Sequence, residues 1–120
     1  MYFVVVSQQG PSWDTSRTMR DQQLWPDHVA FINGLIDDGF LLLGGPLADR
    51  SRPDDDFSPA SEPVGDGRLY RTMVVVQASE SGAADGRLAE DPWIRSGVLV
   101  RTSIERWEVL VGDPSAAGEA

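Results

Sequence analysis

The chain contains no cysteine and no lysine, and His28 is its single histidine. The absence of cysteine excludes disulfide bonds, thiolate metal sites and cysteine nucleophiles. The absence of lysine excludes Schiff-base chemistry on a lysine amine. An imidazole can take up or release a proton near neutral pH, so His28 is the first candidate for acid–base chemistry.

Positive charge is also scarce, because 10 arginines face 19 acidic residues and the net charge is −9. This balance argues against nucleic acid, whose binding needs a positive surface, and against an anionic membrane surface. No apolar run reaches the length of a membrane span, and "MYFVVVSQQG" lacks the basic region and cleavage site of a signal peptide. We therefore expect a cytoplasmic protein whose partner is a small molecule or another protein chain.

The apolar pattern predicts alternating strands and helices. Helices are expected from Pro26 to Asp38, where proline suits the first turn, and within residues 81–93. The last strand changes its apolar phase between Val100 and Trp107, which predicts a bulge or a split. Four strands are expected, at residues 2–8, 40–47, 68–79 and 97–111. The order β-α-β-β-α-β predicts an α+β, ferredoxin-like antiparallel sheet with its helices on one face.

The chain is expected to form one domain, residues 1–112, followed by a disordered tail, 113–120. Residues 48–67 hold three prolines and six acidic residues, and they predict a long mobile loop. Three consecutive acids in this loop, Asp54 to Asp56, could bind a hard cation. Such runs are more often solvated, so no metal is predicted, and no motif for a cofactor is present.

Both faces of the predicted sheet require burial. The runs "FVVV" and "MVVV", at residues 3–6 and 73–76, do not alternate apolar and polar residues. Two helices cover only one face, and the other face would be a large exposed apolar patch. We expect the same face of a second copy to cover it, which gives a two-fold homodimer, a dimeric α/β barrel.

The histidine points inward in this interpretation. A helix turns by about 100° per residue, so His28 falls about 40° from Ile32, in the middle of the apolar stripe of the first helix. It is either a core histidine bound to a backbone carbonyl or a general acid–base group. Asp91 precedes Pro92 and either caps the next short segment or orients the imidazole. The two roles of Asp91 can coexist.

Other candidates have both structural and functional interpretations. Trp25 and Trp93 are core or interface residues by default, and they become the walls of an aromatic-sized site if His28 and Asp91 meet. Gly45 and Pro46, after the second strand, either let the strand bend or leave room for a substrate. Arg20 either pairs with an anionic substrate or is a solvated surface residue.

The inward histidine, "GGP" after the second strand and "DPW" before the last strand together resemble the YCII-related (YciI-like) family. The likeness runs from Tyr2 to about Val111, without the acidic loop. It implies a dimeric ferredoxin-like barrel in which His28 and Asp91 form the active-site pair. One branch of that family removes chloride from a chlorinated hydroxyhydroquinone, and the wider superfamily includes muconolactone isomerases. The long loop and the Trp25-Pro26 pair depart from the family pattern, so the substrate is not carried over.

The leading hypothesis is a cofactor-independent lyase or isomerase that moves a proton on a small cyclic or aromatic oxygenated substrate. His28 would be its general base or acid, and Asp91 would orient the imidazole. The alternatives are a non-catalytic small-ligand binder in the same site and an accessory subunit. A cleft in which His28 and Asp91 are hydrogen-bonded favours the enzyme, whereas an apolar cleft with His28 bonded elsewhere favours the binder.

Overall fold

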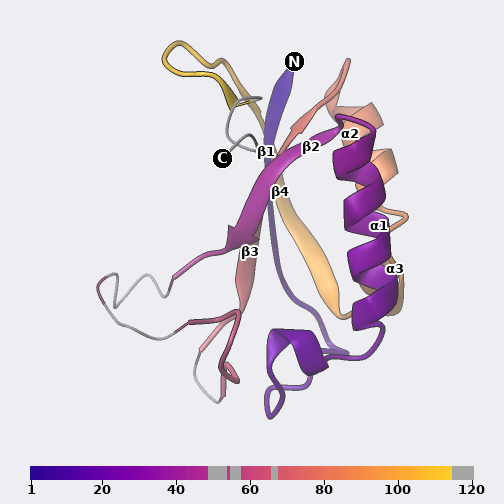
Figure 1. Cartoon of the computed structure of the whole chain (residues 1–120), viewed down its shortest axis with the longest axis vertical. Coiled ribbons are helices and arrows are strands. Elements are labelled where there is room, and N and C mark those ends of the chain that lie inside the picture. Colours follow the sequence, from indigo (N-terminus) through magenta and orange to yellow (C-terminus); the bar gives the residue numbers. More distant parts are fainter. Residues whose placement is uncertain (49–53, 55–57, 66–67, 115–120) are drawn as a thin grey trace.

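The computed structural model describes residues 1–48, 54, 58–65 and 68–114. They form a four-stranded antiparallel sheet with helices on one face, in the strand order β2-β3-β1-β4 (Figure 1). The strands are β1 (Tyr2–Gln9), β2 (Leu41–Pro46), β3 (Arg71–Gln77) and β4 (Leu99–Trp107). The helices are the 3-10 helix η1 (Met19–Asp21), α1 (Trp25–Asp37), α2 (Ser81–Leu88) and α3 (Pro92–Ser96). The predicted α+β ferredoxin-like fold is confirmed.

The last two strands are shorter than the sequence pattern predicts. The backbone N–H of Tyr70 donates to the side chain of Gln9 at 2.9 Å instead of to a neighbouring strand, so β3 begins only after it. β4 ends at Trp107 because its partner on β1 is Tyr2, the first residue of that strand. A strand extends only as far as a partner can satisfy its backbone.

The single helix predicted within residues 81–93 is two helices. Pro92 has no backbone N–H, so α2 cannot continue through it, and Pro92 opens α3 instead. The side chain of Asp91 caps α3 by accepting a hydrogen bond from the backbone N–H of Trp93 at 2.9 Å. The break therefore places a carboxylate at the start of α3.

The predicted irregularity in the last strand is a bulge. Val6 pairs with Ser103 and Ser7 pairs with Arg101, so Thr102 is one extra residue on β4. Strand residues alternate between the two faces, and an extra residue moves every following side chain to the opposite face. Arg101 before this break and Ile104 after it therefore lie on the same face, that of the helices.

The core has two parts. One lies between the sheet and helices α1 and α2, around Val5, Leu35 and Leu88. The other surrounds Trp93 and includes Val64, which is only 3% exposed. Val64 belongs to the predicted loop at residues 48–67, of which residues 49–53, 55–57 and 66–67 lie outside the described residues. Mobility of that loop and disorder of the tail, mostly in residues 115–120, stay predictions.

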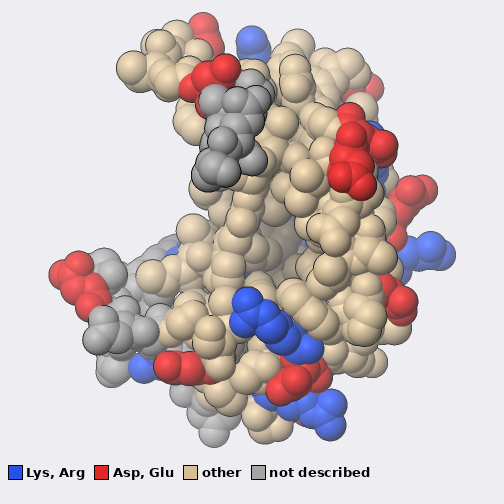
Figure 2. Space-filling model, in the orientation of Figure 1, with Lys and Arg blue, Asp and Glu red and all other residues tan. Residues whose placement is uncertain are grey.

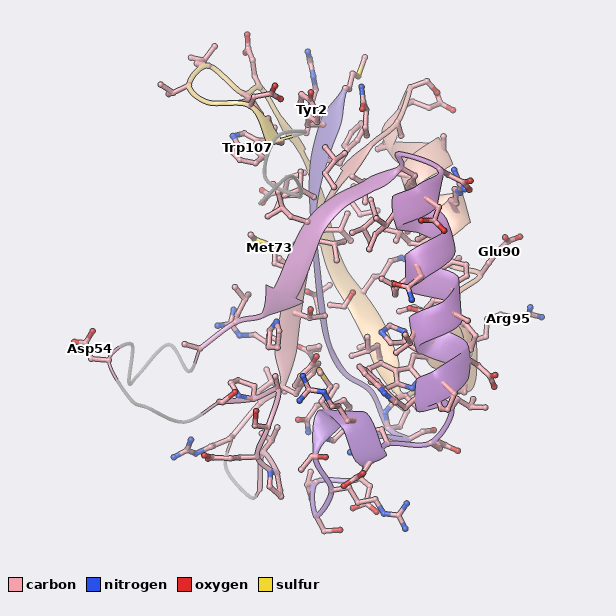
Figure 3. The ribbon with its side chains drawn as sticks, viewed as in Figure 1. Tyr2, Asp54, Met73, Glu90, Arg95 and Trp107 are labelled. Carbon is pink, nitrogen blue, oxygen red and sulfur yellow. The ribbon has the colours of Figure 1, made fainter. Side chains whose placement is uncertain are left out.

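The sheet face opposite the helices carries no helix in the described part of the chain (Figure 1). We call it the open face, and Tyr2, Val4, Val6, Met73 and Trp107 lie on it. Figure 3 shows the labelled side chains of Tyr2, Met73 and Trp107 on the side away from α1. Within the described ranges, no helix is long and apolar enough to cross a membrane.

Candidate functional site

A cleft of about 550 Å³ lies between α1 and the helix-covered face of the sheet. Figure 2 shows it as a hollow in the middle of the molecule. Trp25, His28 and Ile32 line it from α1, and Val5 and Val74 line it from the sheet. Its size is within the range of small-molecule sites, and most of its lining is apolar, as is usual for such sites.

Gly45 and Pro46 of β2 line the cleft, as the substrate-site interpretation expected. A side chain at Gly45 would meet nothing within 4 Å, so this position is open. Gly44 differs, because a Cβ there would lie 2.6 Å from Cγ1 of Val74 and 3.0 Å from the carbonyl oxygen of Met73. Gly44 therefore lets β2 approach β3 closely, which is the structural interpretation of the glycine pair.

His28 and Asp91 meet at the cleft, although 63 residues separate them. The Nδ1 atom of His28 lies 2.9 Å from both carboxylate oxygens of Asp91. Oδ1 of Asp91 also accepts the backbone N–H of Trp93, so Asp91 caps α3 and binds the imidazole at once. Their side chains are 14% and 7% exposed, respectively. A carboxylate buried to this degree needs such partners, and here it has both.

The first turn of α1 determines where His28 lies. Leu24 has a left-handed backbone, with φ of 62°, and its carbonyl accepts the backbone N–H of His28 at 2.9 Å. A non-glycine residue in this region costs on the order of 1 kcal/mol, so the surrounding contacts must hold it. The turn brings the chain sharply into α1 with His28 facing the sheet.

Two tryptophans hold the imidazole in one plane. The rings of His28 and Trp93 stack with centroids 4.0 Å apart and 8° between their planes. Trp93 is fully buried, and its Nε1 donates to the carbonyl of Gln23 at 2.7 Å, which ties α3 to the start of α1. The Trp25 ring lies 5.8 Å from that of His28 and 5.5 Å from that of Trp93. With Nδ1 bound by Asp91, Nε2 of His28 makes no hydrogen bond to a described residue.

Tyr70 also lines the cleft, and sequence reasoning missed it. Burial raises the pKa of Tyr70 to about 12, so its phenol is neutral at all physiological pH values. The hydroxyl donates to the sulfur of Met19 at 3.0 Å, and the ring stacks on Trp13 at 4.3 Å. The only signal in the sequence was an aromatic residue ahead of a strand, which does not identify a site residue.

Two arginines, Arg20 and Arg101, line the cleft from different elements. Arg20, on η1, lines it, is exposed overall and donates to the carbonyl of Ala60 at 2.9 Å. Arg101, on β4, also lines it from the sheet, and it was not singled out from the sequence. Its inward direction depends on the bulge at Thr102.

Among the residues with described positions, no group of three or more histidine, cysteine or acidic side chains lies close enough together to hold a metal ion. Asp54 is exposed, and the rest of the acidic run, Asp55 and Asp56, lies outside the described residues. The proposal of a solvated acidic run is therefore untested.

No protein-family model matches the sequence, and no functionally curated protein matches it. Among solved structures, the chain is similar to 5-chloro-2-hydroxyhydroquinone dehydrochlorinase (TftG) from Burkholderia phenoliruptrix AC1100, in its complex with 2,5-dihydroxybenzoquinone. The identity is 16%, the TM-score is 0.59, and the match covers 90% of this chain and 94% of that one. The likeness shows a shared fold. It does not show membership of a particular family or superfamily.

Proposed function

We propose that this protein is a small cofactor-independent enzyme, a lyase or isomerase that moves a proton on a cyclic or aromatic oxygenated substrate. The observation that carries the proposal is the hydrogen-bonded pair of His28 and Asp91 at the wall of a ligand-sized cleft. The similar solved structure is an enzyme that, by its name, acts on a chlorinated hydroxyhydroquinone. Membership of the YCII-related family is part of the proposal.

The chemistry follows from the two nitrogens of the imidazole. Asp91 accepts a hydrogen bond from the N–H of Nδ1, which leaves the lone pair of Nε2 available as a general base. Nε2 takes a proton from a ring carbon or hydroxyl, and the imidazolium that forms is stabilised by the carboxylate of Asp91. In an elimination, the electron pair of the broken C–H bond forms a double bond and a leaving anion departs. In an isomerisation, the imidazolium returns the proton to another carbon.

The aromatic residues have a positioning role in this proposal. Trp93 stacks on His28, so the imidazole cannot rotate away from the direction that Asp91 sets. Trp25, Gly45 and Pro46 line the same cleft and would contact a flat ring. Aromatic walls supply a large apolar surface to such a ring at little cost in side-chain freedom.

The test begins with a thermal-shift screen of small phenols, hydroquinones, lactones and carboxylates, because a ligand that binds the folded state raises the melting temperature. For each binder, proton NMR in D₂O then measures exchange of ring C–H groups and formation of product. His28→Asn should abolish exchange, and Asp91→Asn should slow it by about 10²–10⁴-fold. Asp27→Asn is the matched control, because Asp27 is exposed beside His28 on α1. Unchanged turnover in His28→Asn would refute the proposal.

The second candidate function is a non-catalytic small-ligand-binding or accessory protein. Aliphatic side chains at part of the cleft, including Ile32, Ile36 and Leu41, favour it, because they offer apolar contact without chemistry. A ligand that binds the wild type and His28→Asn with equal affinity, and that neither protein converts, would select this candidate.

We propose a cytoplasmic homodimer joined through the open face. Three side chains there, Val4, Val6 and Met73, are only half-buried, and Trp107 is 41% exposed. A shallow groove on this face is lined by the apolar residues Val4, Met73 and Trp107 and by the charged residues Glu105 and Arg106. Apolar surface of this kind is commonly covered by the same face of another copy in two-fold dimers.

A further inference from the structure

Two polar side chains that line the cleft have hydrogen-bonding groups that the described residues leave unused. The Nη1 atom of Arg101 is buried and has no hydrogen-bond partner among them. The hydroxyl of Ser7 also makes no hydrogen bond to a described residue, although Ser7 is only 8% exposed. Native proteins pair nearly all buried donors, so the unpaired nitrogen of Arg101 beside the cleft calls for an acceptor.

These two side chains are neighbours. Ser7 on β1 and Arg101 on β4 are paired in the register of the sheet. Residues directly opposite on adjacent antiparallel strands have Cβ atoms about 5 Å apart and share one face. Both residues line the cleft, so a ligand in that part of it can lie beside both side chains.

The bulge creates this pairing. In an unbroken register Thr102 would lie opposite Ser7, and Arg101 would fall on the open face. The extra residue instead directs Arg101 inward, which is what bulges beside functional sites commonly do. This direction places the guanidinium at the edge of a mostly apolar cleft, where a charged group needs polar partners.

The guanidinium is held in place from one side only. Its Nε donates to Oδ1 of Asp85, on α2, at 2.6 Å, and Asp85 is about half-exposed. This contact fixes the orientation of Arg101 and leaves Nη1 for another partner. The charged groups at the cleft are then the cations Arg20 and Arg101 and one carboxylate, Asp91, which is bound to His28. With Asp85, which contacts Arg101, the described charged groups at the cleft are two arginines and two aspartates.

We propose that Arg101 and Ser7 form a binding site for an anionic oxygen of the substrate, a carboxylate or an ionised ring hydroxyl. The guanidinium of Arg101 and the hydroxyl of Ser7 both donate to that oxygen, and hydrogen bonds from a charged donor are the stronger kind. The proposal rests on the proposed function of the same cleft, and it narrows the substrate to small ring compounds that carry an acidic oxygen. Arg101 is then a specificity-determining residue, and His28 remains the group that moves the proton.

The test compares two probes that share a ring. Hydroquinone and 2,5-dihydroxybenzoate differ only by a carboxylate, and isothermal titration calorimetry measures both dissociation constants. Wild type should bind 2,5-dihydroxybenzoate at least about tenfold more tightly, a difference of about 1.4 kcal/mol. Arg101→Gln should remove that preference and leave hydroquinone binding within about twofold. A second arm with 4-nitrophenol, titrated below and above its ionisation, tells an ionised hydroxyl from a carboxylate as the bound group.

Two variants and one control keep the test decisive. Ser7→Ala is a small change that should spare the fold. It should weaken the binding of 2,5-dihydroxybenzoate by about three- to tenfold and leave the binding of hydroquinone unchanged. Arg95→Gln is the matched control, because Arg95 is exposed on α3 and points away from the cleft (Figure 3). It should keep the full preference of the wild type.

The outcomes separate this proposal from the proposed function. His28→Asn should lose turnover yet keep the preference for the carboxylate, so the binding site can stand where catalysis fails. The inference is overturned if the wild type binds hydroquinone and 2,5-dihydroxybenzoate equally tightly, or binds neither compound at millimolar concentration. It is also overturned if Arg101→Gln and Ser7→Ala both retain the preference.

Discussion

The two faces of the sheet are built from neighbouring residues and yet have different roles. On β1, Val5 points toward the helices and is 2% exposed, whereas Val4 points to the open face and is half-buried. The residue type is the same, so apolar character alone does not separate the faces. Polar character alone does not separate them either, because Ser103 and Glu105 lie on the open face opposite Val6 and Val4. The difference is that Ser7, Arg101 and the pair of His28 and Asp91 line one cleft on the helix side.

The helix side is not uniformly closed. Val74 on β3 points to the helices, yet it lines the cleft and is only half-buried, while Val75 on the opposite face is 1% exposed. The helices therefore cover the sheet and leave one gap over its middle, where the polar side chains meet. In our proposals the helix side carries binding and chemistry, and the open face is the surface of association.

The largest expected effect is a difference in stability between two variants, each of which removes a tryptophan from one side of the sheet. Trp93→Ala removes a fully buried ring that stacks on His28, and it should lower the free energy of unfolding by about 3–5 kcal/mol. Trp107→Ala, at a residue 41% exposed on the open face, should cost less than about 1 kcal/mol per monomer. Urea denaturation of both variants, at protein concentrations below the dissociation constant of the proposed dimer, measures the two losses of stability. Equal losses would remove the distinction between the faces.

The next effect concerns Tyr70 at alkaline pH. Burial raises the pKa of Tyr70 to about 12, from its ordinary value of 10.0. Between these values the folded protein keeps a proton that the unfolded chain has lost, so the free energy of unfolding falls as the pH rises. The expected loss is about 2–3 kcal/mol between pH 10 and 12. Denaturation at several pH values should show this loss in wild type and in Tyr2→Phe, which alters the open face, and not in Tyr70→Phe.

A smaller effect distinguishes a site histidine from a core histidine. His28→Asn keeps similar volume and some hydrogen bonding, so stability should fall by no more than about 1–2 kcal/mol. Activity should be lost, while Asp91→Asn should leave the assembly intact and slow turnover. Melting temperature and turnover are measured together for both variants. A heavy loss of stability with function preserved per folded molecule would make His28 a structural residue.

Substitution on the open face should change the stability of the monomer least and the oligomeric state most. Sedimentation at micromolar concentration should give the mass of two 13.1 kDa chains. Trp107→Glu should give single chains, because burying an unpaired carboxylate at the interface is costly. Glu90→Gln, an exposed residue on the helix side, is the control and should leave the dimer unchanged (Figure 3). A single-chain mass for the wild type would refute the dimer.

Local signals in the sequence were sufficient for most of the fold. The β-branched run after Met1 predicts β1, and Pro26 with Gly39 marks the ends of α1 within one or two residues. The bulge could also be anticipated, since a phase change in a strand needs one extra residue. What the pattern could not provide was α3, because five residues carry no measurable periodicity. Its cap at Asp91 and its left-handed end at Gly97, with φ of 80°, were the only signals.

The sequence by itself determined which reactive side chains are available, namely one imidazole, no thiol and no lysine amine. It also determined that helices cover one face of an antiparallel sheet. Only the tertiary structure decided which groups meet. The contact of His28 with Asp91 joins residues 63 positions apart, and it depends on the left-handed turn at Leu24 and on the packing of α1 against α3. Arg101 faces Ser7 only because one residue is added on β4, and a phase change does not reveal which residue that is. Periodicity describes the face on which a side chain lies, whereas a site is made by distances across the fold, which the packing of distant elements sets.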